Sequence, residues 1–500
     1  MKEVIIGVDG GTTAVKAVAF DLDGEIVASH HEGVPVEYGS RGEAEQDMNS
    51  IWEAVASCLR SVSANVSDSK IIGLGLTGQG DGVWLVDEQG EPVRKAANWL
   101  DGRSADRVDQ WQEDGRSEKL LELTGTPAFG GFFPVLYEEL REAEPDTIAR
   151  AQTQLYCKDW IRFKLTGERL TDYTEASRTF LDVNTVEGYD MSVPEALGIG
   201  DAAKLLPEIR HADGPPAHVT EAASAETGIP AGTPVGIGMI DVAVTGMGLG
   251  TVDDGETWLI LGTTGFVGTL LPSAAERKSK ESSILATGIG TQVLEFMAPM
   301  TGTPNLNWIR EILRVEDATW DEIEEAAKKS AVGSGGIIYL PYASPGGERA
   351  PFLDLNASAS WQGLSLTSSR ADILRSVYEG VALSLVECIR VLEVQRDLVV
   401  SGGGFRSDFL CQLLADISHL NVVRQDAPEA GARGAAVLGL VSAGRFDSLK
   451  EAAKALGATT ETFTPNEENH EKYKQVMDLF LRTREAVQPL WKDMRSLRQL

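Results

Sequence analysis

Positive charge is scarce in this sequence. Its 500 residues include 75 Asp and Glu against 45 Lys and Arg, which gives a formal net charge of −30 and an isoelectric point near 4.6. Nucleic-acid binding needs a basic face, so DNA and RNA are excluded as main partners. An anionic ligand must instead be met by local backbone N–H groups and a bound cation. The acidity fits either a saline habitat or simple solubility, and the sequence leaves both open.

Cysteines and long apolar runs are also few. The four cysteines are scattered, with no CxxC pair and no Cys/His spacing typical of a metal site: Cys58, Cys157, Cys388 and Cys411. Reduced thiols in a cytoplasmic protein are the natural expectation. The sequence has no signal-peptide pattern and no run of about 18 apolar residues, so we expect no membrane partner.

What the sequence has instead is an alternation of apolar strands and amphipathic helices. A strand, a turn and a strand are expected over residues 3–21, a helix near 46–62, and a strand-turn-helix unit over 231–252. This alternation is typical of an α/β protein. A content of 42% hydrophobic residues supports real cores, and the length allows two large domains.

The first apolar strand ends in a carboxylate. Asp9 precedes Gly10-Gly11-Thr12-Thr13, whose amides and hydroxyls can approach a phosphate closely, and Lys16 lies one strand pair away. A lone buried charge is costly, so we expect compensation by Mg²⁺ carried on phosphates. An ordinary hairpin turn in which Asp9 accepts turn N–H bonds is an equal alternative. The pattern GxxxxGK[ST] is missing here, which excludes a Walker-type ATPase.

Two further glycine-rich turns follow apolar strands. Gly262-Thr263-Thr264 repeats the opening hairpin in the second half, and Gly402-Gly403-Gly404 leads into a helix that starts near Ser407. The second turn can approach a phosphate or a flat ring beside the positive end of a helix. Taken alone, that turn favours a plainer interpretation, a tight strand-to-helix connection with Ser407 as N-cap.

Asp241 follows another apolar strand and begins a helix. As an N-cap it would be unremarkable. As a catalyst it is well placed, because the positive helix end should keep it ionised and able to accept a hydroxyl proton.

Two loops offer groups suited to a polyol. "LTGQGDG" supplies Gln79 and Asp81, and "NWLDGRS" supplies Trp99, Asp101 and Arg103. A carboxylate can accept bonds from two adjacent hydroxyls, and an aromatic plate lies beside it in sequence. Loop structure and a surface ion pair are the commoner roles of such residues.

Together these segments resemble the FGGY family of carbohydrate kinases, in the hexokinase/actin superfamily, essentially end to end. The segments that carry the resemblance are "GVDGGTTAVKAVAFD", "CKDWIRFKLTGE", "TDYTEASRT", "LGTTG", "GERAPFLD", "ASWQGLSLTSSRADILRSVYE" and "VVSGGGFRSDFLCQLLAD". It implies two actin-like (ribonuclease H-like) α/β domains with ATP in the interdomain cleft. Residues 1–248 would bind the sugar and carry the catalytic base, and residues 249–500 would bind the nucleotide. The implied reaction is Mg²⁺- and ATP-dependent phosphorylation of a terminal hydroxyl.

The resemblance also implies roles for single residues. Asp241 matches the catalytic base, and Asp9 matches the magnesium-associated aspartate. The positions that match nucleotide contacts are Thr12, Thr13, Lys16, Gly262, Thr263, Asn305, Gly402, Gly403 and Ser407. The positions expected to bind the acceptor are Gln79, Gly80, Asp81, Trp99, Asp101, Arg103 and Asp241.

The pair after Gln79 narrows the acceptor. D-Xylulose kinases usually carry Met-His there and glycerol kinases Arg-Glu, whereas this chain has Gly80-Asp81. "TGQGDGVWLVD" and "NWLDGRS" look more like the L-xylulose and erythritol kinase branches, and "RVDQWQEDGRSEKLLELTG" resembles the L-xylulose branch in particular. Gly80 should leave space while Asp81 keeps a polyol-binding group. We therefore expect a small ketose or polyol of four or five carbons: L-xylulose, D-xylulose or erythritol.

Several alternatives stay open. Glycerol and ribulose are acceptors of the same family. A non-catalytic sugar sensor and an actin-like ATPase are alternatives of another class. The ATPase would not need Asp241 with Asp81 and Trp99 in one pocket, and the presence of Asp9, Lys16 and Asp241 speaks against the sensor. The assembly state is undetermined, with a homodimer as one option.

Overall fold

The computed structural model describes residues 2–457 and 459–497, which form two compact units. Unit 1 takes Met1–Asp254, Leu270–Leu294 and Ala427–Ala458, and unit 2 takes Gly255–Thr269, Glu295–Asp426 and Thr459–Leu500. Both units contain strands and helices, so the α/β class is confirmed. Each unit is made of three separate stretches of the chain, so no single boundary in the sequence divides them. The division into 1–248 and 249–500 stays a prediction.

Unit 1 is built on a mixed sheet with the order β12-β13-β6-β1-β2-β3, with β14 also paired to β6. Its strands are β1 (Lys2–Gly10), β2 (Ala14–Asp21), β3 (Ile26–Gly33), β6 (Ser69–Gly78), β12 (Ala217–His218), β13 (Pro234–Val235) and β14 (Met239–Ile240). β1 and β2 form the antiparallel hairpin that the sequence predicts, β3 pairs with β2 in antiparallel orientation, and β6 lies parallel to β1.

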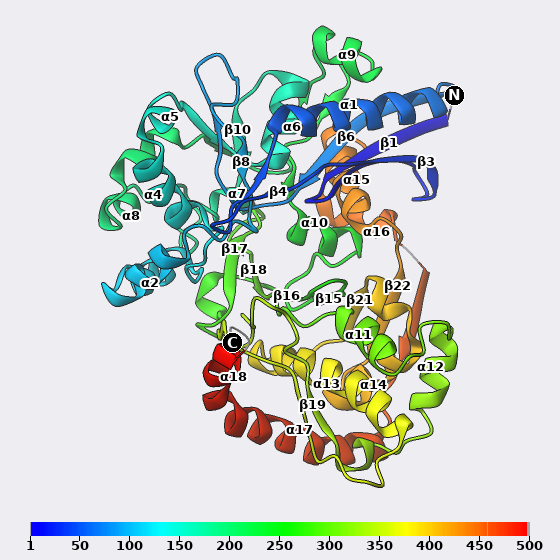
Figure 1. The fold of residues 1–500 in the computed structure, drawn as a ribbon. Coiled ribbons are helices and arrows are strands. Elements are labelled where there is room, and N and C mark those ends of the chain that lie inside the picture. Colours follow the sequence, from blue (N-terminus) through cyan, green and yellow to red (C-terminus); the bar gives the residue numbers. More distant parts are fainter. Residues whose placement is uncertain (1, 458, 498–500) are drawn as a thin grey trace. The chain divides into compact units, whose positions relative to one another are not determined.

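Two helices cover opposite faces of this sheet. Side chains alternate along β1, so Val4, Ile6 and Val8 enter the core with α1 (Met48–Asn65), and Gly7 faces α15 (Ala430–Ser442). A Cβ at Gly7 would lie 1.8 Å from the carbonyl oxygen of Ala432. The helix therefore rests directly on the strand backbone, and Figure 1 shows α15 beside β1 and β6 although they are far apart in sequence.

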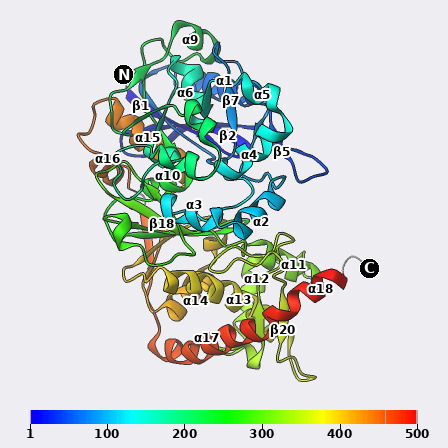
Figure 2. The same ribbon diagram turned by 90° about the vertical axis from the view of Figure 1, so that its left-hand side faces the viewer.

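Unit 2 contains strands of a second sheet, in which hydrogen-bonded neighbours follow the order β18-β16-β15-β21-β22-β23. Its strands are β15 (Thr257–Leu261), β16 (Gly265–Leu271), β18 (Val293–Met297), β21 (Leu398–Ser401), β22 (Val422–Asp426) and β23 (Thr459–Phe463). β15 and β16 form the predicted hairpin, and β21 lies parallel to β15. Helices α13 (Arg370–Val391), α14 (Asp408–Ser418) and α17 (Glu467–Val487) pack against one another in this unit (Figure 2).

The described residues form further helices and strands. The other helices are α2 (Ala105–Glu113), α3 (Arg116–Thr124), α4 (Phe133–Ala143), α5 (Pro145–Ala149), α6 (Cys157–Thr166), α7 (Tyr173–Ala176), α8 (Ser192–Ala196), α9 (Glu221–Thr227), α10 (Asp241–Gly248), α11 (Pro304–Ile312), α12 (Trp320–Ala327), α16 (Leu449–Ala455) and α18 (Trp491–Leu497). The other strands are β4 (Glu37–Tyr38), β5 (Ala44–Gln46), β7 (Trp84–Val86), β8 (Ala96–Ala97), β9 (Thr153–Leu155), β10 (Leu170–Asp172), β11 (Glu208–Arg210), β17 (Ser283–Ala286), β19 (Ile338–Leu340) and β20 (Ser360–Gln362). Within the described residues, every helix is too short or too polar to span a bilayer.

Candidate functional site

Three parallel strands of unit 1 end at the same edge of the sheet. Across β1 and β6, Gly10 pairs with Gly78, and across β14 and β6, Ile240 pairs with Gly78. Strands in a sheet lie about 4.8 Å apart, so the ends of β1 and β14, on either side of β6, are about 10 Å apart. Asp9, Gln79 and Asp241 therefore gather at one edge. The carboxyl ends of parallel strands are a common place for ligand sites in α/β folds.

Asp9 lies in a small group of charges at the end of β1. It pairs in register with Lys16 across the hairpin, and Lys16 Nζ lies 2.8 Å from Glu429 Oε2. Burial raises the pKa of Asp9 to about 6, the Lys16 charge opposes that rise, and the Glu429 charge adds to it. Glu429 precedes α15 with a left-handed φ of 57°. The sequence analysis missed this residue, because only the fold brings α15 to β1.

Asp241 begins α10, and its Oδ1 accepts the N–H of Val242 at 2.7 Å. Burial and then the charge of Asp9 raise the pKa of Asp241 to about 7, and the backbone bond only partly opposes them. The expectation that the helix end keeps this carboxyl fully ionised was therefore wrong, since desolvation outweighs the helix N-terminus. Near neutral pH the group is poised between its two protonation states.

The loop after β6 is held by other side chains. Gln79 Nε2 donates to Gln46 Oε1 at 2.7 Å, while the buried Gln79 Oε1 has no hydrogen-bond partner. Asp81 adopts a left-handed φ of 61°. Its carboxylate accepts two bonds from Arg178, Nε to Oδ1 at 2.8 Å and Nη2 to Oδ2 at 3.1 Å. Arg178 belongs to "TDYTEASRT", and the sequence analysis assigned it no role.

Gly80 does not leave free space. A Cβ at Gly80 would lie 2.0 Å from Ile240 Cδ1 and 3.2 Å from Glu175 Oε2. The expectation of an empty volume was therefore wrong, because Ile240 and Glu175 already fill the position of a side chain. An acceptor contact by Gly80 itself stays a prediction.

Trp99 and Thr12 meet through a side-chain hydrogen bond. Trp99 Nε1 donates to Thr12 Oγ1 at 2.9 Å, and Gln46 Nε2 donates to the Thr12 carbonyl oxygen, also at 2.9 Å. The neighbouring Thr13 is exposed. Trp99, expected to bind the acceptor, thus touches the turn expected to bind phosphate.

Asp101 and Arg103 form a buried ion pair. Arg103 Nε donates to Asp101 Oδ1 at 2.9 Å, and Asp101 Oδ2 accepts the Ala44 N–H at 2.9 Å. Glu45 also pairs with Arg103. The two residues thus support loop structure, as the plainer interpretation held, although the pair is buried and not at the surface. Their contact with an acceptor stays a prediction.

In unit 2, two glycine turns follow the parallel strands β15 and β21 at one sheet edge. The Gly262 carbonyl accepts the Thr303 N–H at 2.8 Å, which fixes the turn that contains Thr263. Gly402 has a φ of 102°, and a Cβ there would lie 2.8 Å from the Leu261 carbonyl oxygen. A Cβ at Gly403 would meet nothing within 4 Å, so its surface is open to a ligand.

Ser407 and Asn305 already have structural partners. Ser407 Oγ accepts the Leu410 N–H at 3.0 Å and caps α14, as the plainer interpretation predicted. Asn305 is 3% exposed. Its Oδ1 accepts from Tyr339 at 2.8 Å, and its Nδ2 donates to the Gly302 carbonyl at 3.2 Å. Nucleotide contacts by these two residues stay predictions.

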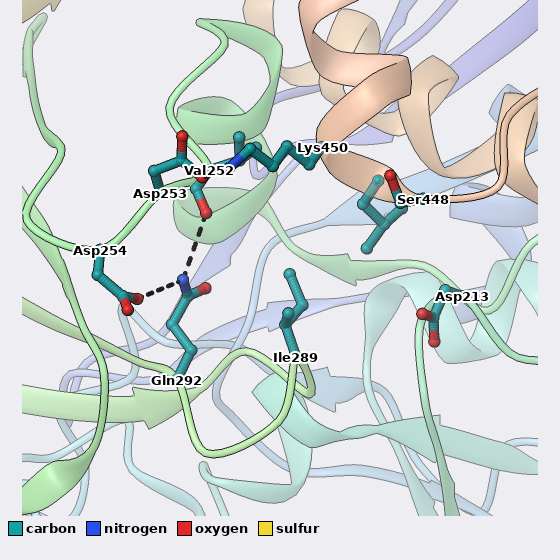
Figure 3. Close-up of a pocket in the computed structure, with 9 residues that line it drawn as sticks. Asp213, Val252, Asp253, Asp254, Ile289, Gln292, Ser448 and Lys450 are labelled. Carbon is teal, nitrogen blue, oxygen red and sulfur yellow. Dashed lines mark hydrogen bonds and ion pairs between the residues drawn. The ribbon is translucent and has the colours of Figure 1, made fainter.

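A further pocket of unit 1, about 240 Å³ in volume, contains none of the predicted site residues in its lining (Figure 3). Gln292 Nε2 there donates to Asp254 Oδ1 at 2.8 Å, and Lys450 pairs with Asp253. Because these polar groups bond to one another, the pocket offers a weaker ligand site than the strand ends.

The comparisons agree on one family. Residues 4–248 match the N-terminal domain of the FGGY family of carbohydrate kinases, and residues 258–443 match its C-terminal domain. The erythritol kinase of Brucella abortus is 31% identical over 99% of this chain and 98% of its own length. The L-xylulose/3-keto-L-gulonate kinase of Escherichia coli is 28% identical over 95% of both chains. The crystal structure of gluconate kinase from Lactobacillus acidophilus has a TM-score of 0.92 at 26% identity, covering 99% of this chain and 100% of that one.

Proposed function

Because the chain belongs to the FGGY family of carbohydrate kinases, we propose that it phosphorylates a terminal hydroxyl of a four- or five-carbon ketose or polyol, such as L-xylulose, D-xylulose or erythritol. Carbohydrate kinase activity with ATP as donor follows from the family, and the acceptor is the proposal. The observation that carries it is the pairing of Asp81 with Arg178 beside the strand ends that hold Gln79 and Asp241. A carboxyl group there can accept hydrogen bonds from neighbouring hydroxyls.

The charges favour a neutral acceptor over a sugar acid. Arg178 is paired with Asp81, and Arg103 with Asp101 and Glu45. A sugar carboxylate would need a cation to offset its desolvation, and these two already serve protein carboxylates. This supports ketoses and polyols over gluconate-like acids.

Asp241 is the proposed general base. In the transfer, the acceptor hydroxyl gives its proton to the Asp241 carboxylate, its oxygen bonds to the terminal phosphorus of ATP, and ADP leaves. A base with a pKa of about 7 is matched to neutral pH, since it combines a large ionised fraction with a useful proton affinity. Phosphoryl transfer otherwise depends mainly on positioning and charge neutralisation.

Asp9 fits a magnesium ion that arrives with ATP. Its carboxylate is an oxygen donor, and its charge raises the pKa of Asp241, so a cation held by Asp9 would offset the repulsion between the two carboxylates. Within residues 2–457 and 459–497, no cluster of three or more His, Cys, Asp or Glu side chains could enclose a metal by itself. That agrees with Mg²⁺, which keeps several waters and binds phosphates with one or two carboxylates. When bound, the ion would neutralise phosphate charge.

The nucleotide is proposed to bind the glycine turns of unit 2. Gly262, Thr263 and Gly402 follow parallel strands, and Gly403 has an open surface. Backbone amides of such turns approach phosphates without steric cost. In unit 1, Thr12, Thr13 and Lys16 stay phosphate contacts predicted from the sequence.

Coupled ADP release with Mg²⁺-ATP tests the acceptor proposal. The panel contains L-xylulose, D-xylulose, L- and D-ribulose, erythritol, glycerol and gluconate. We expect one neutral four- or five-carbon acceptor to have a kcat/KM well above the others. A preference for gluconate, or silence across the panel while ATP binding is detected, would contradict the proposal.

A further inference from the structure

The backbone N–H of Ile240, the residue before Asp241, is held by a side chain from elsewhere in the chain. The N–H of Ile240 donates to Thr174 Oγ1 at 2.9 Å, and the Thr174 hydroxyl donates to Asp172 Oδ2 at 2.6 Å. Thr174 and Asp172 are both 0% exposed. Ile240 is the last residue of β14, and Asp241 is the first of α10, so this bond lies at the strand-to-helix corner that aims the Asp241 carboxylate.

Asp172, which accepts the hydrogen bond of the Thr174 hydroxyl, belongs to a buried cluster of ion pairs. Asp172 Oδ1 lies 2.9 Å from Lys158 Nζ, and Lys158 also pairs with Asp159, all three side chains being fully buried. Breaking a buried pair would leave an uncompensated charge in the protein interior, which is strongly unfavourable. The cluster is therefore rigid, and it holds the Thr174 side chain in one position.

The same short segment holds the loop proposed to bind the acceptor. Arg178, four residues after Thr174, clamps the Asp81 carboxylate with two hydrogen bonds. Glu175 lies between these contacts, against Gly80 and Ile240. Residues 172–178 thus touch both the corner before Asp241 and the loop that carries Asp81.

We propose that Thr174 is a positioning residue for phosphoryl transfer: its hydroxyl holds the backbone N–H of Ile240, the residue before Asp241, and so sets where the base meets the acceptor hydroxyl. The inference rests on the proposed function, since it needs Asp241 to act as the base. Asp172 and Lys158 act through Thr174, and none of the three touches the reacting atoms. A displacement of about 1 Å in such geometry can cost two orders of magnitude in rate.

Thr171 provides a matched control that separates positioning of Asp241 from a purely structural role of the Thr174 hydroxyl. Thr171 Oγ1 donates to Asp159 Oδ2 at 2.8 Å, and its side chain is 1% exposed. In each case loss of the hydroxyl leaves the carboxylate with a backbone donor, the Thr174 N–H for Asp172 and the Tyr156 N–H for Asp159. Both changes remove one hydroxyl from the same cluster, but only one releases Ile240.

The experiment compares Thr174→Val, Thr174→Ser and Thr171→Val as full-length enzymes on the best acceptor of the panel. We expect Thr174→Val to lower kcat by about 10- to 100-fold, with little change in the KM for the acceptor or ATP. Thr174→Ser should restore most of kcat, because its hydroxyl keeps both bonds. Thr171→Val should lower the Tm by about as much as Thr174→Val does, but its kcat should stay close to that of wild type.

Two results would overturn the inference: a wild-type kcat in Thr174→Val, or an equal loss of kcat in Thr171→Val. If Thr174→Val does not fold, Thr174→Cys replaces it, since its thiol is a weak acceptor of similar size, and the same kcat loss is expected. A wild-type enzyme silent on every acceptor would contradict the proposed function and this inference with it. An active wild type with an unchanged Thr174→Val kcat would remove the inference alone.

Discussion

Asp241 and Asp9 keep their protons to higher pH than free aspartates do, because burial disfavours their charged forms. The raised pKa values, about 7 and about 6, lie where a base and a cation site can both respond near neutrality. The positions of both carboxyls could be read from the sequence, since each directly follows an apolar strand. Their protonation could not, because it depends on neighbours that only the fold supplies.

This protonation predicts a pH dependence. Asp241 must be ionised to accept a proton, and its pKa is raised to about 7, so the active form is lost as pH falls through about 7. We expect kcat/KM for the acceptor to decrease about tenfold per pH unit below that point and to level off above it. A profile that stays flat between about pH 5.5 and 8.5 would contradict the assignment of Asp241.

The residues that support the site were harder to predict. Thr174 acts on Ile240, 66 positions away, and Arg178 on Asp81, 97 positions away. No local spacing reports such contacts. The expectation of free space at Gly80 was wrong for the same reason, because the side chain that fills this space belongs to the distant residue Ile240.

At the scale of elements, strands and helices were predictable where a short pattern determines them. The opening hairpin, α1 and α10 follow from apolar periodicity and from glycine turns. The position of α15 in unit 1 was not predictable, because its place on β1 and β6 depends on glycines from segments far apart in sequence.

That packing gives a test of element-level stability. A Cβ at Gly75 of β6 would lie 1.5 Å from the Ala435 carbonyl oxygen in α15, a clash between backbone atoms that cannot rotate away. We expect Gly75→Ala to destabilise the protein by about 3 kcal/mol or more, measured by urea unfolding. The control Gly33→Ala, on exposed β3, would meet only Thr13 O at 4.0 Å and should change stability by less than about 0.5 kcal/mol. Equal effects would refute the tight α15 contact.

The two interpretations of Ser407 also separate at this scale. Ser407 caps α14 and Ser369 caps α13, each through its side-chain oxygen. Replacing either serine with alanine should cost about 1 kcal/mol. If Ser407 also contacts the nucleotide, only Ser407→Ala raises the KM for ATP. An unchanged KM for ATP in both variants would leave Ser407 as a cap alone.

At the scale of the whole molecule, the sequence predicted the α/β class and the family, because phosphate-type turns and family segments recur along its length. It did not predict that residues 270–294 and 427–457 belong to unit 1. Contacts between segments so far apart in sequence form only in the folded chain, and they leave no local pattern in the sequence. The net charge of −30 likewise identifies no partner.

We propose that the ends of β1, β6 and β14 form a sugar kinase site with Asp241 as its base. The most direct measurement compares wild type with Asp241→Asn on the best acceptor, recording kcat from ADP release and acceptor affinity by calorimetry. The account predicts a kcat lower by about two to four orders of magnitude with acceptor binding largely retained, since the amide cannot take the proton. A near-normal kcat in Asp241→Asn would contradict it.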